Sequence, residues 1–438
     1  MKNNSIYDVI CIGAGPFNIG FAAMAATKTK LSCLLVDQKL KFDWHHNMIL
    51  PGTHLQVPFY ADLVTMVDPQ NPFTFLSYLK AQKRLFRFTI RESQFPLRLE
   101  YNDYCKWVLD HLNSVAMGHR CEGITYDGRS KLYKVTTRNL LTGQDKVFLS
   151  RNIVIGIGMD PKMPPNITSD SNRIFHSNGY LKSRHQIFEG DSATIIGSGQ
   201  SAAEIFNDLL DTEAEQIQHL SWFTRSSRFY PMDYSKFALE MTSPDYIDYF
   251  YSLPTEVKMK TLEKQNGLYK GINMQLIETI YDKLYEKSLL DNTQKIEMHA
   301  NSSILSIQQD NEKISCLVKQ EQTKSTFIHQ TDAVILATGY QYQIPAFLRN
   351  IKHILNWDAN GKYDVNKNYS IDHRETIFVQ NAELHTHGFN TADLGMGPYR
   401  NAMILNSILG YKLFEFDEKI PFQTFGHPEM RKEQLPFN

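Results

Sequence analysis

The sequence lacks lysine and arginine over residues 42–79. Lysine and arginine together number 46 among 438 residues, so a stretch of this length would ordinarily hold roughly four. The same stretch keeps three acids, Asp43, Asp62 and Asp68, beside several aromatic residues. If it lines a site, we therefore expect an apolar or cationic ligand rather than an anion.

The sequence also lacks a CxxC pair. Its five cysteines are scattered at positions 11, 33, 105, 121 and 316. We expect reduced, mostly buried thiols, as in a cytoplasmic protein. The absence of a cysteine pair also excludes a disulfide reductase.

Strong net charge and long apolar runs are absent as well. The formal net charge is -1, which offers no basic field for nucleic acid and no polybasic segment for a membrane surface. No apolar run approaches the ~18 residues that span a bilayer, and the N-terminus lacks the apolar region of a signal peptide. We expect a soluble, cytoplasmic protein of two or three domains that binds neither nucleic acid nor membrane.

The sequence does contain a repeated pattern of strand, glycine turn and helix. Residues 7–15 (YDVICIGAG) form an apolar run closed by glycines, followed by an Ala-rich helix over 17–27 and a second strand over 31–38. Residues 191–210 and 219–227 repeat the pattern. This repetition predicts an α/β fold with two Rossmann-like dinucleotide-binding domains.

The remaining segments complete the predicted arrangement. Strands are predicted over 151–158 and 331–340, and residues 237–289 have helical spacing without a glycine-turn signal, which indicates a small helical insert for the substrate. The expected domains are a first dinucleotide-binding domain in two parts, a second one in two parts, and the insert, at residues 1–170 and 331–438, residues 171–232 and 290–330, and residues 233–289.

The first glycine turn reads GAGPFNIG. Gly13 permits the tight turn and Gly15 lets the backbone approach a pyrophosphate at the helix N-terminus, while Asn18 stands in place of the usual third glycine. Asp37, at the end of the second strand, is placed to accept hydrogen bonds from both ribose hydroxyls.

The second glycine turn reads GSGQSAAE. Gly197 and Gly199 have the same two functions, but the next strand ends in Arg225, and an arginine there favours the 2′-phosphate of NADPH. An acid at one site and an arginine at the other predict FAD plus NADPH, and hence a flavin redox enzyme. Without a cysteine pair, a monooxygenase or an oxidase-like enzyme remains.

Two histidine groups could suggest a metal. His45-His46 and the pair His385 and His387 have no third ligand at a recognisable spacing, so we predict no metal site. We expect both groups to pack near the flavin ring instead, His45 beside Trp44.

The order of the motifs adds a family resemblance. GAGPFNIG, DWHHNM, Leu55-Gln56, RLEYNDYCKW, GSGQSAAE, ATGY and HTHGF follow one another over about residues 5–410. In this combination the chain resembles the microbial flavin monooxygenases that hydroxylate side-chain amines for siderophores. That family includes lysine and ornithine N-monooxygenases as well as diamine and histamine N-hydroxylases.

The resemblance implies the chemistry and the assembly. In such enzymes NADPH reduces FAD, reduced FAD takes up O2 as a flavin hydroperoxide, and the distal oxygen passes to a primary amine while water leaves. The family is often tetrameric, so a homo-oligomer is expected. The reacting amine must be neutral, and an apolar pocket lowers its pKa from about 10.4, so no side-chain base is required.

Motifs and resemblance together assign cofactor contacts to particular residues. Those expected at FAD are Gly13, Gly15, Pro16, Asn18, Asp37, Trp44, His45, Gln56 and Leu394. Those expected at NADPH are Gly197, Ser198, Gly199, Gln200, Ser201, Arg225, Tyr269 and Thr338.

The chain departs from the ornithine-type members where those enzymes hold the amino-acid head group. Their Phe-Leu-Lys-Asp-Leu is FYADL here, so Ala61 replaces the lysine that binds the α-carboxylate. Ungapped matching places Leu239, Leu268 and Gly395 at three further positions that are polar in those members.

These losses predict the class of substrate. Without a cation, holding a carboxylate away from water costs several kcal/mol. We therefore predict an amine without an α-carboxylate, putrescine or cadaverine first and histamine next. Tyr60, Asp62 and Tyr269 are the predicted contacts for its far cationic or imidazole end, with a structural loop role as the alternative for Asp62.

Three alternatives stay open. The substrate could be L-ornithine or L-lysine. FHSNGYL (175–181) has some similarity to the signature of Baeyer–Villiger or sulfur-oxidising flavin monooxygenases, although the DWHHNM block argues against that group. The protein could also have kept FAD and lost catalysis, against which the intact GSGQSAAE and Arg225 argue.

Overall fold

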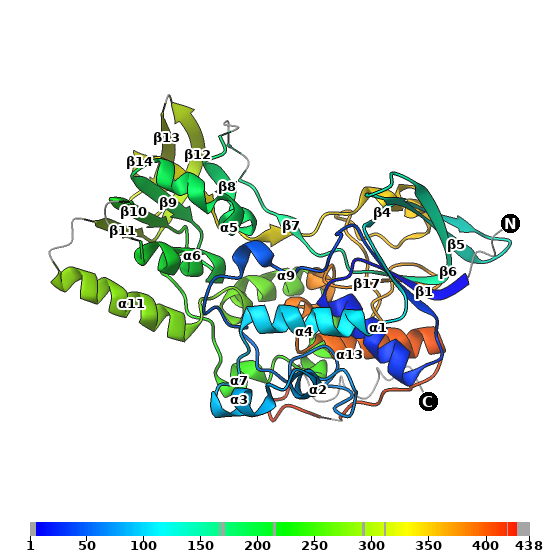
Figure 1. The fold of residues 1–438 in the computed structure, drawn as a ribbon. Helices are drawn as coiled ribbons and strands as arrows, with labels where there is room; N and C mark the ends of the chain where they lie inside the picture. Colours follow the sequence, from blue (N-terminus) through cyan, green and yellow to red (C-terminus); the bar gives the residue numbers. More distant parts are fainter. Residues whose placement is uncertain are drawn as a thin grey trace.

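The computed structural model describes residues 6–164, 166–167, 171–212, 216–290, 294–310, 312–417 and 419–426. Two α/β units lie next to each other (Figure 1). The chain passes between them twice, through the short strands β7 (Asp160–Pro161) and β16 (Tyr340–Gln341), which pair antiparallel with each other.

The first unit is built on a seven-stranded sheet in the order β3-β2-β1-β6-β5-β4, with β17 also paired to β6. The parallel part holds β1, β2, β3, β6 and β17, and β4, β5 and β6 form an antiparallel meander. The strands are β1 (Ile6–Ile12), β2 (Cys33–Asp37), β3 (Val115–Met117), β4 (His119–Asp127), β5 (Leu132–Asn139), β6 (Asp145–Ile155) and β17 (Ile377–Val379).

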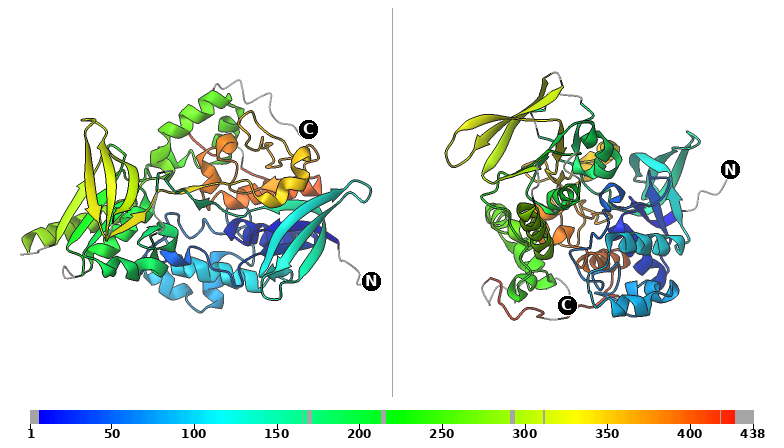
Figure 2. Two further views of the ribbon diagram at one scale, coloured as in Figure 1. Left: turned by 90° about the horizontal axis from the view of Figure 1, so that it is seen from above. Right: turned by 60° about the vertical axis from the view of Figure 1, so that its left-hand side comes forward.

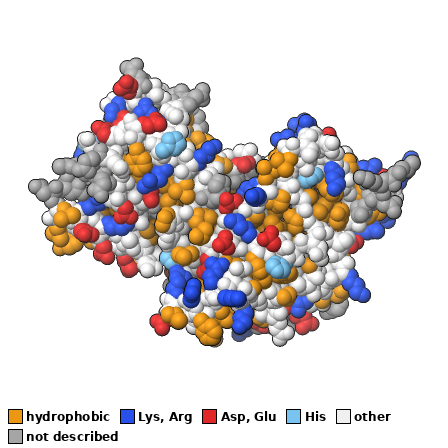
Figure 3. Space-filling model, in the orientation of Figure 1, with side chains coloured by type: hydrophobic (Ala, Val, Ile, Leu, Met, Phe, Trp, Pro, Cys, Tyr) orange, Lys and Arg blue, Asp and Glu red, His pale blue; other side chains and the backbone are white. Residues whose placement is uncertain are grey.

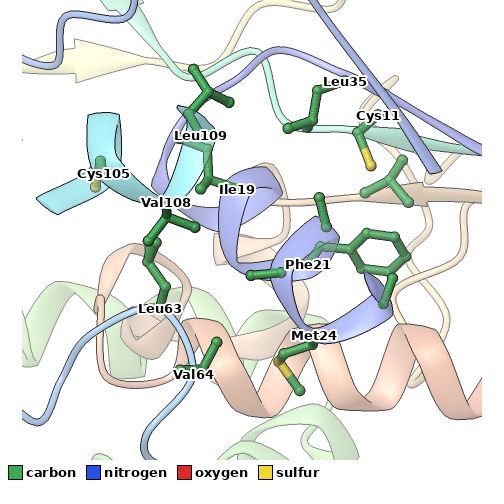
Figure 4. Close-up of a cluster of buried hydrophobic side chains, with 14 of the residues drawn as sticks. Cys11, Ile19, Phe21, Met24, Leu35, Leu63, Val64, Cys105, Val108 and Leu109 are labelled. Atoms are coloured by element: carbon green, nitrogen blue, oxygen red, sulfur yellow. The ribbon is translucent and has the colours of Figure 1, made fainter. Parts of the chain in front are cut away.

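Three helices pack together against this sheet, namely α1 (Pro16–Lys28), α4 (Arg98–Asp110) and α13 (Gly397–Leu409). Figure 4 shows Phe21 and Met24 of α1 above α13, with Val108 of α4 on the other side. These side chains are fully buried, because α1 is apolar on nearly all faces and lies between the sheet and its two neighbours. The smaller helices α2 (Phe75–Ala81) and α3 (Leu85–Ile90) complete this side of the unit.

The second unit has a five-stranded, all-parallel sheet in the order β11-β10-β9-β15-β8. Helix α6 (Gln200–Leu210) follows its central strand, and a three-stranded antiparallel sheet, β12-β13-β14, projects from the unit (Figure 2). The strands are β8 (Ile174–His176), β9 (Ser192–Ile196), β10 (His219–Phe223), β11 (Lys295–His299), β12 (Ser302–Asp310), β13 (Lys313–Gln320), β14 (Thr326–Thr331) and β15 (Ala333–Leu336).

The predicted helical insert is present as five helices. They are α7 (Lys236–Leu239), α8 (Pro244–Ser252), α9 (Thr255–Lys264), α10 (Asn266–Tyr269) and α11 (Met274–Leu289). The last of them, α11, packs Leu276, Ile277 and Ile280 into the core of the second unit, so it belongs to that unit's helical layer.

The predicted α/β class and both parallel-sheet units are confirmed. The expected domain boundary at residue 331 is wrong, because β15 lies in the second sheet between β9 and β8, and the chain returns to the first unit only after residue 336. Asp332 fixes this strand: its Oδ2 accepts hydrogen bonds from the Ser192 N–H at 3.1 Å and the Ser192 hydroxyl at 2.6 Å.

The surface has no single dominant charge on the face in Figure 3, where acidic and basic side chains are interspersed. In the part of the chain that the structure describes, no helix has both the length and the apolar character needed to cross a membrane. The same described residues contain no cluster of three or more His, Cys, Asp or Glu side chains able to hold a metal ion.

Candidate functional site

The first glycine turn joins β1 to α1. Gly13 has φ +95°, and a Cβ added there would lie 2.3 Å from the Gly156 carbonyl oxygen, so only glycine fits. Gly15 precedes α1 with no side chain capping the helix, which leaves the first N–H groups open to an anion. Asp37, at the end of β2, accepts a hydrogen bond from the Ala14 N–H at 2.7 Å. These are the features that a dinucleotide pyrophosphate and ribose require.

Asn18 supports this turn from within the core. Its side chain is fully buried, donates to the carbonyl oxygens of Ile12 (3.1 Å) and Gly13 (2.7 Å), and accepts from the Gln380 amide at 2.7 Å. Asn18 was predicted as an FAD contact, but its side chain is already occupied by the protein and shapes the turn instead. Gln380, which donates to Asn18, was not among the site residues predicted from the sequence.

The second glycine turn joins β9 to α6. Gly197 has φ +151°, and a Cβ there would lie 2.2 Å from the Ala337 carbonyl oxygen. Gly199 precedes α6, again without a side-chain cap, and Ser198 and Ser201 are partly accessible beside it. The second turn therefore has the same open helix N-terminus as the first.

Arg225 follows β10 and is exposed. Among the described residues it forms no ion pair, so its guanidinium is available for a phosphate. Thr338 was predicted to contact NADPH too, but its hydroxyl donates to the Lys162 carbonyl at 2.5 Å. Thr338 therefore holds together the two segments that connect the units.

The loop that carries Gln56 is linked to the second glycine turn through two glutamines. The Gln56 amide donates to Gln200 Oε1 at 3.1 Å, and the same oxygen accepts the Asn273 N–H at 2.8 Å. Gln200 Nε2 in turn donates to Glu204 Oε1 at 2.8 Å. Gln56, expected at the flavin, and Gln200, expected at NADPH, thus touch at the boundary of the two units.

A buried ion pair lies directly beside this link. Both Arg98 guanidinium nitrogens of α4 donate to Glu204 of α6, each at 2.7 Å, and Glu204 is 4 % exposed. Burial raises the pKa of Glu204, while Arg98 and Gln200 act in the opposite direction. Arg98 belongs to the motif RLEYNDYCKW and Glu204 to GSGQSAAE. Neither motif indicates that the two residues pair across 106 positions.

Trp44 and His45 lie in the loop after β2. The backbone N–H of Trp44 donates to Asn102 Oδ1 at 2.9 Å. The rings of Trp44 and His45 meet edge to face, with their centroids 4.5 Å apart. Protein surrounding the ring, with the positive charges of Arg98 and Lys39, lowers the pKa of His45 to about 4, although its side chain keeps an exposed edge. His45 is therefore neutral above that pH. The side chain of His46 lies outside the described part of the structure.

His385 and His387 are structural rather than flavin contacts. Burial lowers the pKa of His387 to about 3, and its ring stacks on Tyr369 with centroids 4.3 Å apart. His385 Nε2 is 2.8 Å from the Tyr363 carbonyl oxygen. The expectation that this pair packs against a flavin ring is not supported, since both imidazoles are used to hold residues 363–369.

Pro16 and Leu394, both expected at the flavin, lie close together. They line a cavity of about 10 Å³, roughly the space of one water molecule, beside the start of α1. The same cavity is lined by Asn401, whose Oδ1 is buried without a hydrogen-bond partner among the described residues. An unpartnered buried polar atom beside a nucleotide turn is what a site completed by a ligand or water leaves.

Ala61 and Gly395 meet, although 334 positions separate them. A Cβ added at Gly395 would lie 3.2 Å from the Ala61 Cβ, and Ala61 is 5 % exposed. Two positions at which ornithine-type members are expected to carry a lysine and another polar residue therefore lie together. In this chain these two positions contribute a methyl group and bare backbone, and neither supplies a cation.

Asp62 has the structural role that was the alternative expectation. It is 2 % exposed, and its carboxylate accepts hydrogen bonds from the N–H groups of Val64, Thr65 and Phe75 and from the Thr65 hydroxyl. All four bonds are 2.7–2.8 Å long. The prediction that Asp62 meets the far end of the substrate is therefore wrong, because each carboxylate oxygen already accepts two hydrogen bonds from the protein.

The other predicted substrate residues are dispersed. Leu268 packs in an aromatic cluster with Tyr246 and Phe250, and Tyr269 stacks on Phe389 with centroids 6.1 Å apart. The remaining two, Tyr60 and Leu239, are exposed by 42 % and 43 %. Tyr269 and Leu268 both pack against the cluster that contains Phe389, the first residue of the short helix η5 (Phe389–Ala392) before Gly395.

The family profile and the two curated relatives described next all concern N-hydroxylating monooxygenases. The profile of the L-lysine 6-monooxygenase/L-ornithine 5-monooxygenase family matches residues 5–342. The chain is 43 % identical to a putrescine N-hydroxylase of Shewanella oneidensis over 424 residues, covering 97 % of this chain and 85 % of that one. It is 40 % identical to a putrescine N-hydroxylase of Acinetobacter baumannii, covering 97 % and 95 %.

A solved structure agrees with these relatives. The FAD-bound cadaverine monooxygenase of the desferrioxamine pathway of Erwinia amylovora superposes with a TM-score of 0.93. That protein is 41 % identical, and the alignment covers 97 % of this chain and 99 % of that one.

Proposed function

Because the chain belongs to the L-lysine 6-monooxygenase/L-ornithine 5-monooxygenase family, we propose that it N-hydroxylates a diamine, putrescine or cadaverine, for siderophore biosynthesis. It is a flavin-dependent N-monooxygenase. The relatives just described act on putrescine and cadaverine and match nearly the whole chain.

The residues present suit FAD and NADPH. FAD would be held by the turn at Gly13 and Gly15 and by Asp37, and NADPH by the turn at Gly197 and Gly199 with Arg225. When bound, the two cofactors and O2 supply the redox and oxygen-transfer chemistry. The contribution of this chain is to bind and orient the ligands and to exclude water.

The contact between Ala61 and Gly395 carries the choice of a diamine over an amino acid. An amino-acid substrate brings a carboxylate that needs a cation or several donors, since burying an unpaired charge is costly. A methyl group and a glycine provide neither at this place. The absence of lysine and arginine from residues 42–79 agrees with this choice.

The reacting end of the diamine must be neutral. The nucleophile is the neutral amine, yet an alkylamine in water is protonated below a pKa of about 10.4. We propose that this end meets apolar surroundings away from the Ala61–Gly395 contact, because an apolar environment disfavours the charged form and lowers the pKa of the amine. No side-chain base is required on this proposal.

The proposal is tested by following hydroxylated product, not merely NADPH oxidation, with putrescine, cadaverine, histamine, L-ornithine and L-lysine. We expect the highest kcat/KM with putrescine or cadaverine. An ornithine or lysine optimum would overturn the proposal and support the amino-acid alternative.

Arg225 is expected to select NADPH over NADH. Replacing it by Gln should raise the KM for NADPH by about 10- to 100-fold, the effect of one lost charge-assisted contact to phosphate. The KM for NADH should change little, because that cofactor lacks the 2′-phosphate. Arg374→Gln, which removes an exposed arginine of the first unit, is the control. An unchanged ratio of the two KM values would show that Arg225 does not contact the phosphate.

We further propose that the protein acts in the cytoplasm as a homo-oligomer, a tetramer by resemblance to the family. Helix α11 has an apolar stripe suited to such an assembly: Tyr281, Tyr285 and Leu289 are spaced four residues apart and exposed by 61–69 %.

A further inference from the structure

Asp393 lies beside the contact between Ala61 and Gly395. Its Oδ1 accepts the Gly395 N–H at 2.7 Å, and a Cβ added at Gly395 would lie 3.1 Å from this oxygen and 3.2 Å from the Ala61 Cβ. We propose that the Asp393 carboxylate binds the far, charged ammonium of the diamine and so determines both the class of substrate and the end that reacts. This inference rests on the proposed function and deepens it.

Asp393 is the carboxylate of this region that stays open to a ligand. Protein surrounds the carboxylate, yet the residue is not fully buried. Asp62, the other acid beside Ala61, is buried and fully bonded by four donors. Of the two acids that flank Ala61 and Gly395, only Asp393 can therefore receive a new partner.

The Asp393 carboxylate has no ion-pair partner among the described residues. The donors that reach it are the backbone N–H groups of Gly395 and Met396. The positive charge of Arg400 also acts on it, but Arg400 Nη1 is bonded to Glu383 and to the Thr391 carbonyl, and no Arg400 donor is bonded to Asp393. Burial raises the pKa of Asp393, while the two N–H groups and Arg400 act in the opposite direction.

An ammonium ion supplies what this site lacks. It would form a charge-assisted hydrogen bond with the carboxylate and remove the cost of an unpaired buried charge. The α-carboxylate of ornithine or lysine would instead approach a like charge, with Ala61 offering no compensating cation. Asp393 therefore attracts the diamine and repels the amino acid, which is specificity by both attraction and repulsion.

The same contact distinguishes the two ends of a symmetric molecule. The end at Asp393 stays an ammonium, since an opposite charge favours the charged form. The other end has no carboxylate partner on this proposal, so it can lose its proton and react. One carboxylate thereby ensures that a diamine is hydroxylated at one nitrogen while the other remains charged.

The test compares a diamine with a monoamine of equal length, cadaverine with pentylamine. Asp393→Asn should lower kcat/KM for cadaverine by about thirtyfold or more, mainly through KM, and change kcat/KM for pentylamine by less than about threefold. Glu278→Gln, which removes the same charge from an exposed site on α11, is the matched control. FAD content, measured by absorbance, verifies that each variant is folded and loaded.

Two outcomes would overturn the inference. Equal losses on cadaverine and pentylamine would mean that Asp393 only shapes its loop, and no loss on cadaverine would mean that it does not meet the ammonium. If wild-type enzyme prefers ornithine or lysine, the proposed function itself fails, whatever Asp393→Asn does. If wild-type enzyme prefers diamines and Asp393→Asn is unaffected, only this inference fails.

Asp393→Glu provides a second, independent measurement. It keeps the charge but moves the carboxylate one methylene further from the backbone, so the ratio of kcat/KM for putrescine to that for cadaverine should rise relative to wild type. An unchanged ratio would overturn the placement of the carboxylate at the far end of the substrate, even if Asp393→Asn does not fold.

Discussion

Replacing Glu204 by Ala is expected to lower the free energy of unfolding by about 3–5 kcal/mol. Glu204 is 4 % exposed, and its carboxylate is the partner of both terminal nitrogens of Arg98 at 2.7 Å. Removing it leaves a largely buried guanidinium without a counter-charge. The loss should be visible in urea unfolding followed by circular dichroism, with flavin release as a second probe.

The expected loss of stability arises because Glu204→Ala leaves the charge of Arg98 buried without a partner. The intact Arg98–Glu204 pair contributes much less to the free energy of unfolding than this loss suggests. Taking both charges out of water offsets much of their attraction, so an apolar pair of similar volume is often no less stable. Arg98→Met combined with Glu204→Leu should therefore recover most of the stability that Glu204→Ala loses. A double variant as unstable as the single one would contradict this account.

A surface acid provides the control for charge removal. Glu278 is exposed on α11, and Glu278→Ala should change the free energy of unfolding by no more than about 0.5 kcal/mol. If Glu204→Ala were equally mild, the Arg98 guanidinium would have to reach water, and the pair could not hold α4 against α6.

The Arg98–Glu204 pair also has a consequence for the cofactor sites. Gln200 donates to Glu204 and accepts from Gln56, so the pair and the two glutamines form one continuous connection between the units. Glu204→Ala should therefore loosen the approach of the second glycine turn to Gln56. A lower rate of flavin reduction by NADPH in the same variant would report that change.

The local part of the fold could be predicted from the sequence. β1 covers Ile6–Ile12 where residues 7–15 were expected, and α1 covers Pro16–Lys28 where 17–27 were expected. Apolar runs and glycine turns act over a few residues, and Gly13 with φ +95° is the kind of position that only glycine tolerates. The glycine turns of both units were recognisable for that reason.

The contacts between distant segments could not be predicted in this way. Asn18 is bonded to Gln380 across 362 positions and Arg98 to Glu204 across 106, and no periodicity encodes either partner. The role of Asp62 was also misjudged, because its four donors come from a local turn and from the start of α2, which only the folded chain brings together. Strand β15 was recognised as a buried strand, but its sheet was not, since an apolar run does not name its neighbours.

The position of Asp393 in the sequence already suggests that it lies near the substrate. Gly395 was matched to a substrate position, and the carboxylate stands two residues before it in DLGMG. A loop that places one residue in a site places its neighbours close to that site as well. The missing lysine at Ala61 indicated what the pocket does not bind, whereas a nearby acid indicates what it does bind.

Replacing Ala61 by Lys is expected to lower kcat/KM for putrescine and cadaverine by about 100-fold or more. The new ammonium would lie at the place where Ala61 meets Gly395, next to the Asp393 carboxylate. It would repel the charged end of the diamine and occupy its proposed partner, and like charges in contact cost several kcal/mol. Steady-state product formation with each diamine measures the loss.

Ala61→Met separates charge from size in this experiment. Methionine has nearly the length of lysine without the charge, so it should lose activity by crowding Gly395 but should not alter the preference between a diamine and a monoamine. Ala61→Lys should abolish that preference and lower the ratio of diamine to ornithine turnover. Unchanged diamine kinetics in Ala61→Lys would place Ala61 outside the pocket, whereas equal losses in the two variants would leave only its size as the reason for alanine at this position.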